Sequence, residues 1–476
     1  MSSSTRLIFV VFDSADQYWL KHWAKAGDLP NFKRLGDASL HGEIENRPGV
    51  FTIATWFSLA TGVEPTRHGF YSFSQYDPGT YRLTNIEAEK LHYQTLWQAL
   101  DEQGKKCAVI DFPRMPLLKL QHGLQVIDWY PHDLSANGLA SDPENVAIEI
   151  QKRYGSDPFE GHCDRFRLKS ADDFKEFITI VEKRIQCKVE FAESLWRSSR
   201  FDTLTVGFGD AHCAGHQCWH LQHADHLRHD KILAHAVPDP IKQVYRALDT
   251  ALGRLLDLAD ENTKIVVLAN PGMEANYHSK IQAAELLERI NESLPHGDHA
   301  VNTMSSQPMP ELARKKSLSV PVGDTYFAIR ANVIDRERYG ILRMGMELDA
   351  YLQEITQEIM ALHREDGLCV FDDVIRTSDT YHVDHQHNLP DLMFKSRRDL
   401  PSRVITSPLV GSATSNFTPH RSGDHNPLGA YWVYPAPNGV LKSDTVRDLD
   451  IGVTLCALFD TDIEDCDGNV IDQWLV

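Results

Sequence analysis

Hydrophobic and polar positions along the chain form two kinds of segment. Residues 6–12 (RLIFVVF) are a continuous apolar run, and similar runs lie at 107–112, 203–208 and 264–269. Such runs are typical of strands that are covered on both faces, as in a parallel sheet. Further strands are predicted at 389–394 and 429–435, and helix-type periodicity lies at 93–104, 240–259 and 283–290.

This alternation of strands and helices predicts an α/β fold with a doubly wound, mainly parallel sheet. Residues 1–112 are expected to form the N-terminal part of the core. The alternation stops at 113–200, where an insertion or cap is expected. Residues 201–476 are expected to complete the core and to add a C-terminal subdomain from about residue 324. Residues 292–322 lack periodicity and are rich in Ser, Pro, Met and Lys, which predicts an exposed loop.

Histidines follow or accompany the apolar runs. His212 and His216 lie in FGDAHCAGHQCWH, directly after the run at 203–208, and His425 lies in SGDHNPLG. On a helix, the spacing of four places His212 and His216 on one face. Close imidazoles joined by a distant third are a ligand set suited to zinc. Asp210 is a further candidate ligand or a group that orients one. The alternative is a histidine-rich surface stretch.

Two more candidate residues lie at predicted element boundaries. Asp13 ends the first apolar run, where burial of an unpaired carboxylate is costly, so a metal-ligand role is favoured over a helix N-cap. Thr52 follows a Pro-Gly turn at the start of a short predicted helix. A helix N-terminus favours an alkoxide nucleophile and an anionic substrate, although a plain threonine N-cap explains the pattern equally well.

Composition narrows the partners. The net charge of −19 argues against a nucleic-acid polymer, because phosphate-backbone binding needs a basic surface. This net charge is compatible with a small anionic ester as substrate, since a bound metal makes the local charge at its site positive. No span approaches the length of a membrane helix, so no membrane partner is expected. The eight cysteines form no CxxC pair, which fits a reduced, cytoplasmic protein. The oligomeric state is left open, with a homodimer as one option.

Several motifs, in this order along the chain, resemble those of the alkaline phosphatase superfamily, in its type I phosphodiesterase and nucleotide pyrophosphatase branch. They are VVFDSAD with LPNFKRLGDASLHG, the stretch from Pro48 to PTRHG, the histidine motif, GM at 272–273, PDL at 390–392 and GDHNPLG. The resemblance implies an alkaline phosphatase-like fold. It also implies a site for two metals, usually zinc, with Thr52 as nucleophile and a covalent intermediate that water cleaves.

The resemblance further implies that Asp13 binds the nucleophile-side metal, and that His216 and His425 bind the other. Two positions depart from the family pattern. His212 stands where the family has an aspartate, and Asp210 is the candidate to restore the lost charge. At ANPGM the family has Asp and His ligands, whereas this chain has Asn270 and Pro271. The nucleophile-side metal site is therefore predicted to be depleted, with Asn270 suited only to a harder ion such as Ca²⁺ or Mg²⁺.

The expected function is a metal-dependent hydrolase or group transferase acting on a small phosphate or sulfate ester. The expected cofactor is one divalent metal, zinc before Mn, Fe, Ca or Mg. Arg47 is a candidate contact for the anionic substrate, and Asp424 is a candidate to orient the ring of His425. The alternatives are a metalloenzyme of other chemistry in a biosynthetic pathway and a catalytically silent member of the fold.

Overall fold

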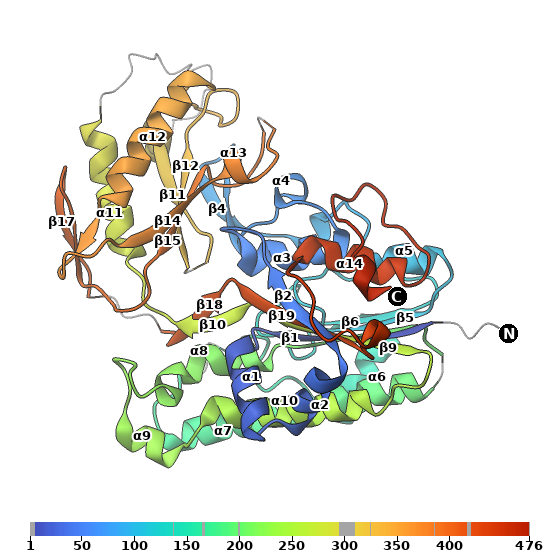
Figure 1. The fold of residues 1–476 in the computed structure, drawn as a ribbon. Coiled ribbons are helices and arrows are strands. Elements are labelled where there is room, and N and C mark those ends of the chain that lie inside the picture. Colours follow the sequence, from blue (N-terminus) through green and yellow to red (C-terminus); the bar gives the residue numbers. More distant parts are fainter. Residues whose placement is uncertain are drawn as a thin grey trace.

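The computed structural model describes residues 5–136, 138–163, 167–198, 200–294, 310–323, 325–384, 386–416 and 420–475. A nine-stranded sheet in the order β20-β2-β19-β9-β1-β8-β5-β6-β7 forms its centre (Figure 1). The strands are β1 (Arg6–Asp13), β2 (Leu40–Glu45), β5 (Cys107–Ile110), β6 (Leu124–Ile127), β7 (Ala140–Asp142), β8 (Thr203–Phe208), β9 (Thr263–Asn270), β19 (Leu428–Tyr434) and β20 (Val446–Arg447). The central run from β9 to β6 is parallel, whereas β7 and β19 are antiparallel to their neighbours. The predicted α/β fold with a mainly parallel sheet is confirmed.

Helices cover both faces of this sheet because every side chain of its central strand β1 is apolar and buried from Leu7 to Phe12. Ile8, Val10 and Phe12 of β1 point into one core, and Leu7, Phe9 and Val11 point into the other. The first face is covered by α1 (Gln17–Ala26), α2 (Pro30–Ala38), α7 (Ala171–Arg197), α8 (Asp210–Gln222) and α10 (Pro240–Leu256). The second is covered by α3 (Phe51–Thr61), α5 (Leu96–Glu102) and α14 (Asp448–Ala457). Helix layers on both faces exclude water from the sheet.

A smaller lobe stands beyond one end of the sheet (Figure 1). It contains a four-stranded antiparallel sheet in the order β11-β12-β15-β14 and a three-stranded sheet β13-β16-β17. Its elements are α11 (Lys280–Ser293), β11 (Ser317–Val320), β12 (Tyr326–Ala331), α12 (Met346–Met360), β13 (His363–Arg364), β14 (Phe371–Arg376), α13 (Thr377–Thr380), β15 (Leu392–Ser396), β16 (Val404–Ser407) and β17 (Gly411–Thr414). A core of its own, which includes Leu287, Ile329 and Ile355, holds the lobe together.

Short elements connect these two bodies and the edges of the sheet. A two-stranded ladder of β10 (Gly272–Ala275) and β18 (Gly423–Asn426) runs between the main sheet and the lobe. The other short elements are α4 (Pro65–His68), β3 (Ser74–Asp77), β4 (Arg82–Asn85), α6 (Asn145–Tyr154) and α9 (Lys231–Ala236).

Residues 113–200, where an insertion or cap is expected, contribute β6 and β7 to the main sheet and α7 to one helix layer. The division into three segments stays a prediction. The segment expected to be an exposed loop, 292–322, lies partly outside the described residues. Its described end contains the strand Ser317–Val320, of which all but one residue are buried.

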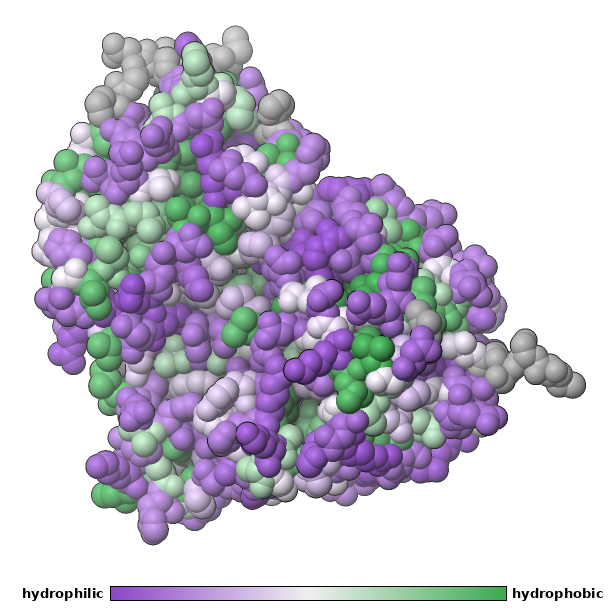
Figure 2. Space-filling model, in the orientation of Figure 1, coloured by the Kyte–Doolittle hydropathy of each residue, from purple (hydrophilic) through white to green (hydrophobic). Residues whose placement is uncertain are grey.

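Hydrophilic residues cover most of the face in Figure 2, and hydrophobic residues form scattered small groups on it. Among the described residues, no helix combines the length and the apolar character that crossing a bilayer requires.

Candidate metal and phosphoester site

The parallel strands deliver the candidate site at their carboxyl ends, where open α/β sheets bind ligands. Asp13 ends β1, and β8 leads directly into α8, which carries His212 and His216. His425 comes from β18, where it pairs with Met273 of β10. The structure therefore brings these four residues together although they are far apart in the sequence. A pocket of about 420 Å³ opens beside them, and Asp13, Thr52, His212, Asp424 and His425 are among its lining residues.

His212 lies between a carboxylate and another imidazole. Its Nδ1 is 2.8 Å from Asp13 Oδ2, and its Nε2 is 2.9 Å from His216 Nε2. His216 Nδ1 donates to the carbonyl oxygen of Gly423 at 2.7 Å, so its Nε2 carries the lone pair. If His212 donates its Nδ1–H to Asp13, the lone pairs of His212 Nε2 and His216 Nε2 face each other. Only a shared proton or a cation makes that contact favourable.

His216 is held neutral. Its ring is fully buried, and burial lowers its pKa well below the usual value, assisted by the Arg421 guanidinium and the neighbouring imidazoles. A neutral imidazole is the form that binds a metal. His216, Asp424 and His425 also place one donor atom each within 4.8 Å of one another. This set of imidazole and carboxylate donors therefore suits a divalent cation of intermediate softness, such as zinc.

His425 is linked to Asp13 through Ser14. The Ser14 hydroxyl donates to Asp13 Oδ1 at 2.9 Å and lies 3.2 Å from His425 Nδ1. Asp424 does not hold the ring tightly, because its Oδ1 is 3.8 Å from His425 Nε2 and instead accepts the backbone N–H of His425 at 2.8 Å. Asp424 therefore fixes the backbone of the SGDH turn and not the ring of His425.

Thr52 lies in the first turn of α3, half-buried and on the wall of the same pocket. No side chain caps this end of α3, whose N-cap residue is Val50. The positive end of the helix is therefore open to an anion in the pocket. Gly323, with φ of +89°, packs so closely that an added Cβ would lie 3.1 Å from the Thr52 hydroxyl oxygen.

Asp210 is not placed with the imidazoles. It is fully buried, and its Oδ1 lies 3.3 Å from Nε of Arg184, a buried arginine of α7. Asp210 does not line the pocket, and it belongs to none of the potential metal-binding groups of the described residues. The structure therefore makes it an ion-pair partner of Arg184 and offers no metal contact for it.

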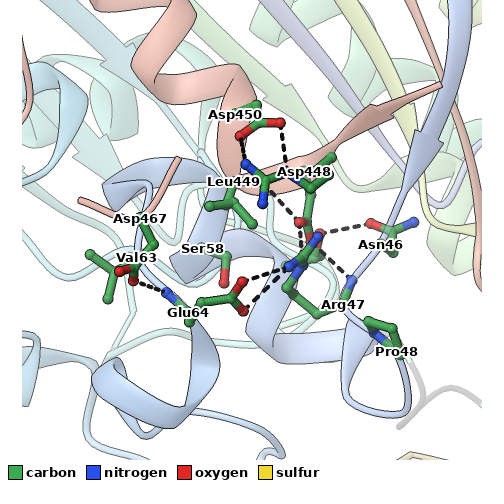
Figure 3. A network of polar contacts seen from close by, with 12 residues as sticks. Asn46, Arg47, Pro48, Ser58, Val63, Glu64, Asp448, Leu449, Asp450 and Asp467 are labelled. Atoms are coloured by element: carbon green, nitrogen blue, oxygen red, sulfur yellow. Dashed lines mark hydrogen bonds and ion pairs between the residues drawn. The ribbon is translucent and has the colours of Figure 1, made fainter. Parts of the chain in front are cut away.

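Arg47 does not line the pocket either. Figure 3 shows its guanidinium enclosed by two carboxylates, with Nε 2.7 Å from Asp448 Oδ1 and Nη1 3.0 Å from Glu64 Oε1. Arg47 and Asp448 are both buried, and Asp448 also accepts from the Thr55 hydroxyl at 2.7 Å. Arg47 thus joins the turn before α3 to the start of α14. It does not face the pocket, whereas the sequence analysis made it a candidate contact for the anionic substrate.

Asn270 occupies the end of β9, beside Asp13 in the sheet register. Its side chain pairs reciprocally with Asn46: Asn270 Nδ2 donates at 2.9 Å, and Asn270 Oδ1 accepts at 2.7 Å. Both polar atoms of this fully buried amide are thus engaged within the protein. The pairing agrees with a depleted nucleophile-side metal site, because the amide oxygen is already a hydrogen-bond acceptor.

The sequence analysis did not identify several residues that line the pocket. His132, Arg114, Asp133 and Arg421 all line the pocket, and the first three come from a stretch with no recognisable motif. Arg114 pairs with Asp133 at 2.9 Å, and Arg421 Nη1 lies 3.3 Å from His216 Nε2. The signal that was present is the adjacent histidine and aspartate in WYPHDL after an apolar run, a pattern too common to single out.

Comparisons with known proteins agree with this fold and site. Residues 7–400 match the sequence model of the type I phosphodiesterase / nucleotide pyrophosphatase family. No curated protein sequence matches the chain. Among solved structures, phosphonoacetate hydrolase from Sinorhizobium meliloti 1021, in complex with phosphonoformate, is 14% identical with a TM-score of 0.54, over 94% of each chain. Human ectonucleotide pyrophosphatase/phosphodiesterase 5 is 12% identical with a TM-score of 0.52, over 98% of this chain and 99% of its own.

A third structure is the murine ectonucleotide pyrophosphatase/phosphodiesterase 5, an inactive Thr-to-Ala variant in complex with AMP. It is 11% identical with a TM-score of 0.50, over 98% of each chain. The fold and its cluster of histidines and aspartates define a member of the alkaline phosphatase superfamily. Because the family model covers most of its length, the chain belongs to the type I phosphodiesterase / nucleotide pyrophosphatase family, a family of phosphoester hydrolases.

Proposed function

We propose that this protein is a metal-dependent hydrolase of small phosphate or phosphonate esters, with Thr52 as the nucleophile. One observation carries the proposal: Thr52 and the donors Asp13, His212 and His425 line a single pocket. The inactive Thr-to-Ala variant of the murine relative supports a threonine nucleophile. Phosphonoformate bound to the bacterial relative supports a small anionic substrate.

The residues present fit one divalent cation, and zinc best. The 2.9 Å contact between the Nε2 atoms of His212 and His216 needs a positive charge between or beside them, and His216 is fixed in the metal-binding tautomer. His425 and Asp424 complete the set. When bound, the cation supplies Lewis-acid stabilisation of the phosphoryl oxygens. Asp13 orients His212 through Nδ1, an arrangement often found around metal-binding histidines.

The chain's own groups account for substrate binding and attack. The uncapped N-terminus of α3 attracts the phosphoryl oxygens. Arg421 lines the pocket, and its guanidinium, 3.3 Å from His216 Nε2, would bind the substrate anion. The Thr52 hydroxyl oxygen bonds to phosphorus as the bond from phosphorus to the leaving oxygen breaks, and the hydroxyl proton passes through solvent to the departing alcohol. Water then cleaves the phosphothreonine, which restores the threonine hydroxyl and releases the free acid. Asp424 keeps the SGDH turn in place during these steps.

A second function is favoured by one specific contact. Asn270 is fully paired with Asn46, and Pro271 offers no ligand, so nothing at this position activates Thr52 as the family's second metal would. A catalytically silent protein that binds a small anion in the same pocket would retain every contact described above. The two functions differ in whether Thr52 is needed for turnover.

The test is a metal count and an ester screen on the same preparations. Metal per chain is measured by elemental mass spectrometry for wild type, His216→Ala and His425→Ala. The proposal expects each variant to hold one equivalent less than wild type. Turnover of p-nitrophenyl phosphate, bis-p-nitrophenyl phosphate and p-nitrophenyl sulfate is then measured for wild type, Thr52→Ala and Thr52→Ser. Metal-loaded wild type that turns over none of these esters, yet binds phosphate or phosphonoformate, would favour the silent protein.

A further inference from the structure

A second cluster of soft donors lies behind the pocket wall, on the far side of His132. Its members are His132, Cys163 and Cys213, and each is buried. His132 Nδ1 is 3.0 Å from Cys163 Sγ and 3.5 Å from Cys213 Sγ. The three donor atoms lie within 4.8 Å of one another. Neither sulfur lines the pocket, so His132 is the one member that the cluster shares with the pocket wall.

His132, His212 and His216 also place one donor atom each within 4.8 Å of one another, but the ring geometry favours the cysteines for His132. The rings of His132 and His212 are stacked, with centroids 3.6 Å apart and planes 17° apart. A metal ion lies in the plane of an imidazole that binds it, and the planes of two stacked rings do not meet near their nitrogens. The Nδ1 edge of His132 points instead at the two sulfurs.

We propose that His132, Cys163 and Cys213 form a second metal site, for a thiophilic divalent cation such as Zn²⁺. Tetrahedral zinc with bonds of about 2.3 Å to sulfur and about 2.0 Å to nitrogen sets a sulfur-to-nitrogen separation of about 3.6 Å. Cys213 already meets that distance, and Cys163 needs to recede by about half an ångström. Three protein donors leave one exchangeable position, which is common for zinc. Cation binding releases the two thiol protons to solvent.

The surroundings suit such a site. The positively charged Arg184 is buried within electrostatic reach of both sulfurs. That charge is itself balanced by Asp210 at 3.3 Å and Asp157 at 3.8 Å. On the opposite edge of the ring, His132 Nε2 lies 3.6 Å from Asp133 Oδ2 and 3.5 Å from Arg421 Nη2. A carboxylate beside the second nitrogen is a common companion of a ligating histidine.

This inference does not depend on the proposed function, because it concerns sulfur ligation and not ester turnover. Cobalt is the probe, since thiolate-bound Co²⁺ gives a near-ultraviolet sulfur-to-metal charge-transfer band that histidine and carboxylate ligands do not give. The full chain is reduced, freed of metal, reloaded with Co²⁺ and compared with Cys163→Ser and Cys213→Ser. Cys218→Ser is the matched control, because Cys218 is buried on the same helix as Cys213.

We expect the band in wild type and in Cys218→Ser, and its loss in Cys163→Ser and Cys213→Ser together with one equivalent of metal. His216→Ala and His425→Ala should keep the band, which separates this site from the imidazole site. Cys163 lies off α8, so its variant gives a result even if Cys213→Ser disturbs that helix. Reduced wild type without the band would overturn the proposal. So would a Cys163–Cys213 disulfide found by mass spectrometry in protein purified without reductant, since it would mark a redox pair.

Discussion

Asn270 and Asn46 hold each other through two reciprocal amide hydrogen bonds at the carboxyl end of the central sheet. The Thr55 hydroxyl oxygen of α3 lies 2.8 Å from Asn46 Oδ1. This pairing joins the end of β9 to the helix that carries Thr52. The position that the resemblance marks as a metal ligand in the family thus serves here to position the helix that carries Thr52.

Asn270→Asp should therefore destabilise the protein and not restore a metal. The new carboxylate would be buried and would lose the donor to Asn46 Oδ1. We expect a loss of about 1–3 kcal/mol in the free energy of unfolding. Urea unfolding and metal content measure the two effects, with Asn438→Asp on an exposed turn as control. A variant of unchanged stability that binds one more equivalent of metal would contradict this account.

Thr52→Ala should abolish ester turnover while leaving the metal content unchanged. Loss of a nucleophile typically lowers kcat by roughly 10³-fold or more. Thr52→Ser keeps the hydroxyl and should retain measurable activity. The check is kcat/KM on the p-nitrophenyl ester that wild type prefers. Equal activity in wild type and Thr52→Ala would exclude a threonine nucleophile.

Arg47→Met should act on stability and not on substrate affinity. Its removal leaves the buried Asp448 without its cation, which costs about 3–5 kcal/mol. The double variant Arg47→Met with Asp448→Asn should recover part of that loss, because no buried charge is left unpaired. Chemical unfolding measures the difference. If Arg47 bound substrate instead, Arg47→Met would raise KM with little effect on unfolding.

His68 should make the protein less stable as the pH falls. Its ring is buried, accepts the N–H of Phe70 at Nδ1 and contacts the Ser58 hydroxyl at Nε2, and burial lowers its pKa to about 3. The unfolded chain takes up a proton near pH 6.5, whereas the folded chain does not until about pH 3. The contribution of neutral His68 to the free energy of unfolding is therefore fully present above pH 6.5. It is lost as the pH falls from 6.5 to about 3, by up to about 1.4 kcal/mol per pH unit.

The measurement is the free energy of unfolding at several pH values between 4.5 and 7.5, for wild type and His68→Gln. The glutamine variant should show a shallower dependence, because one titrating group is gone. An identical slope in the two proteins would show that His68 is protonated in the folded state or contributes nothing. Other buried histidines add to the wild-type slope, so only the difference between the proteins is diagnostic.

Much of the fold follows from local patterns in the sequence. The apolar runs at 6–12, 203–208 and 264–269 became β1, β8 and β9, since a strand buried on both faces has no polar positions to obscure it. His212, His216 and His425 were found because their spacing and their flanking turns are local signals. Thr52 was found in the same way, from a Pro-Gly turn before a helix.

What the sequence did not reveal depends on distant partners. Arg47 is a buried cation because of Asp448, about four hundred positions away, and no local pattern announces that pair. Asp210 stands beside the histidines in the sequence but faces Arg184, because two residues of α-helix rotate its side chain by about 200° from that of His212. His132 has no recognisable motif, so its stacking on His212 was visible only after folding.

The ladder of β10 and β18 has a consequence for biosynthesis. His425 reaches the site only by pairing with Met273, and β19, which follows it, inserts between β2 and β9. During translation, neither the central sheet nor the set of imidazoles is complete until β18 and β19 have left the ribosome. Earlier lengths of chain expose the edges of β2 and β9 and lack His425, so they present unpaired strand edges of the kind that associate with other chains.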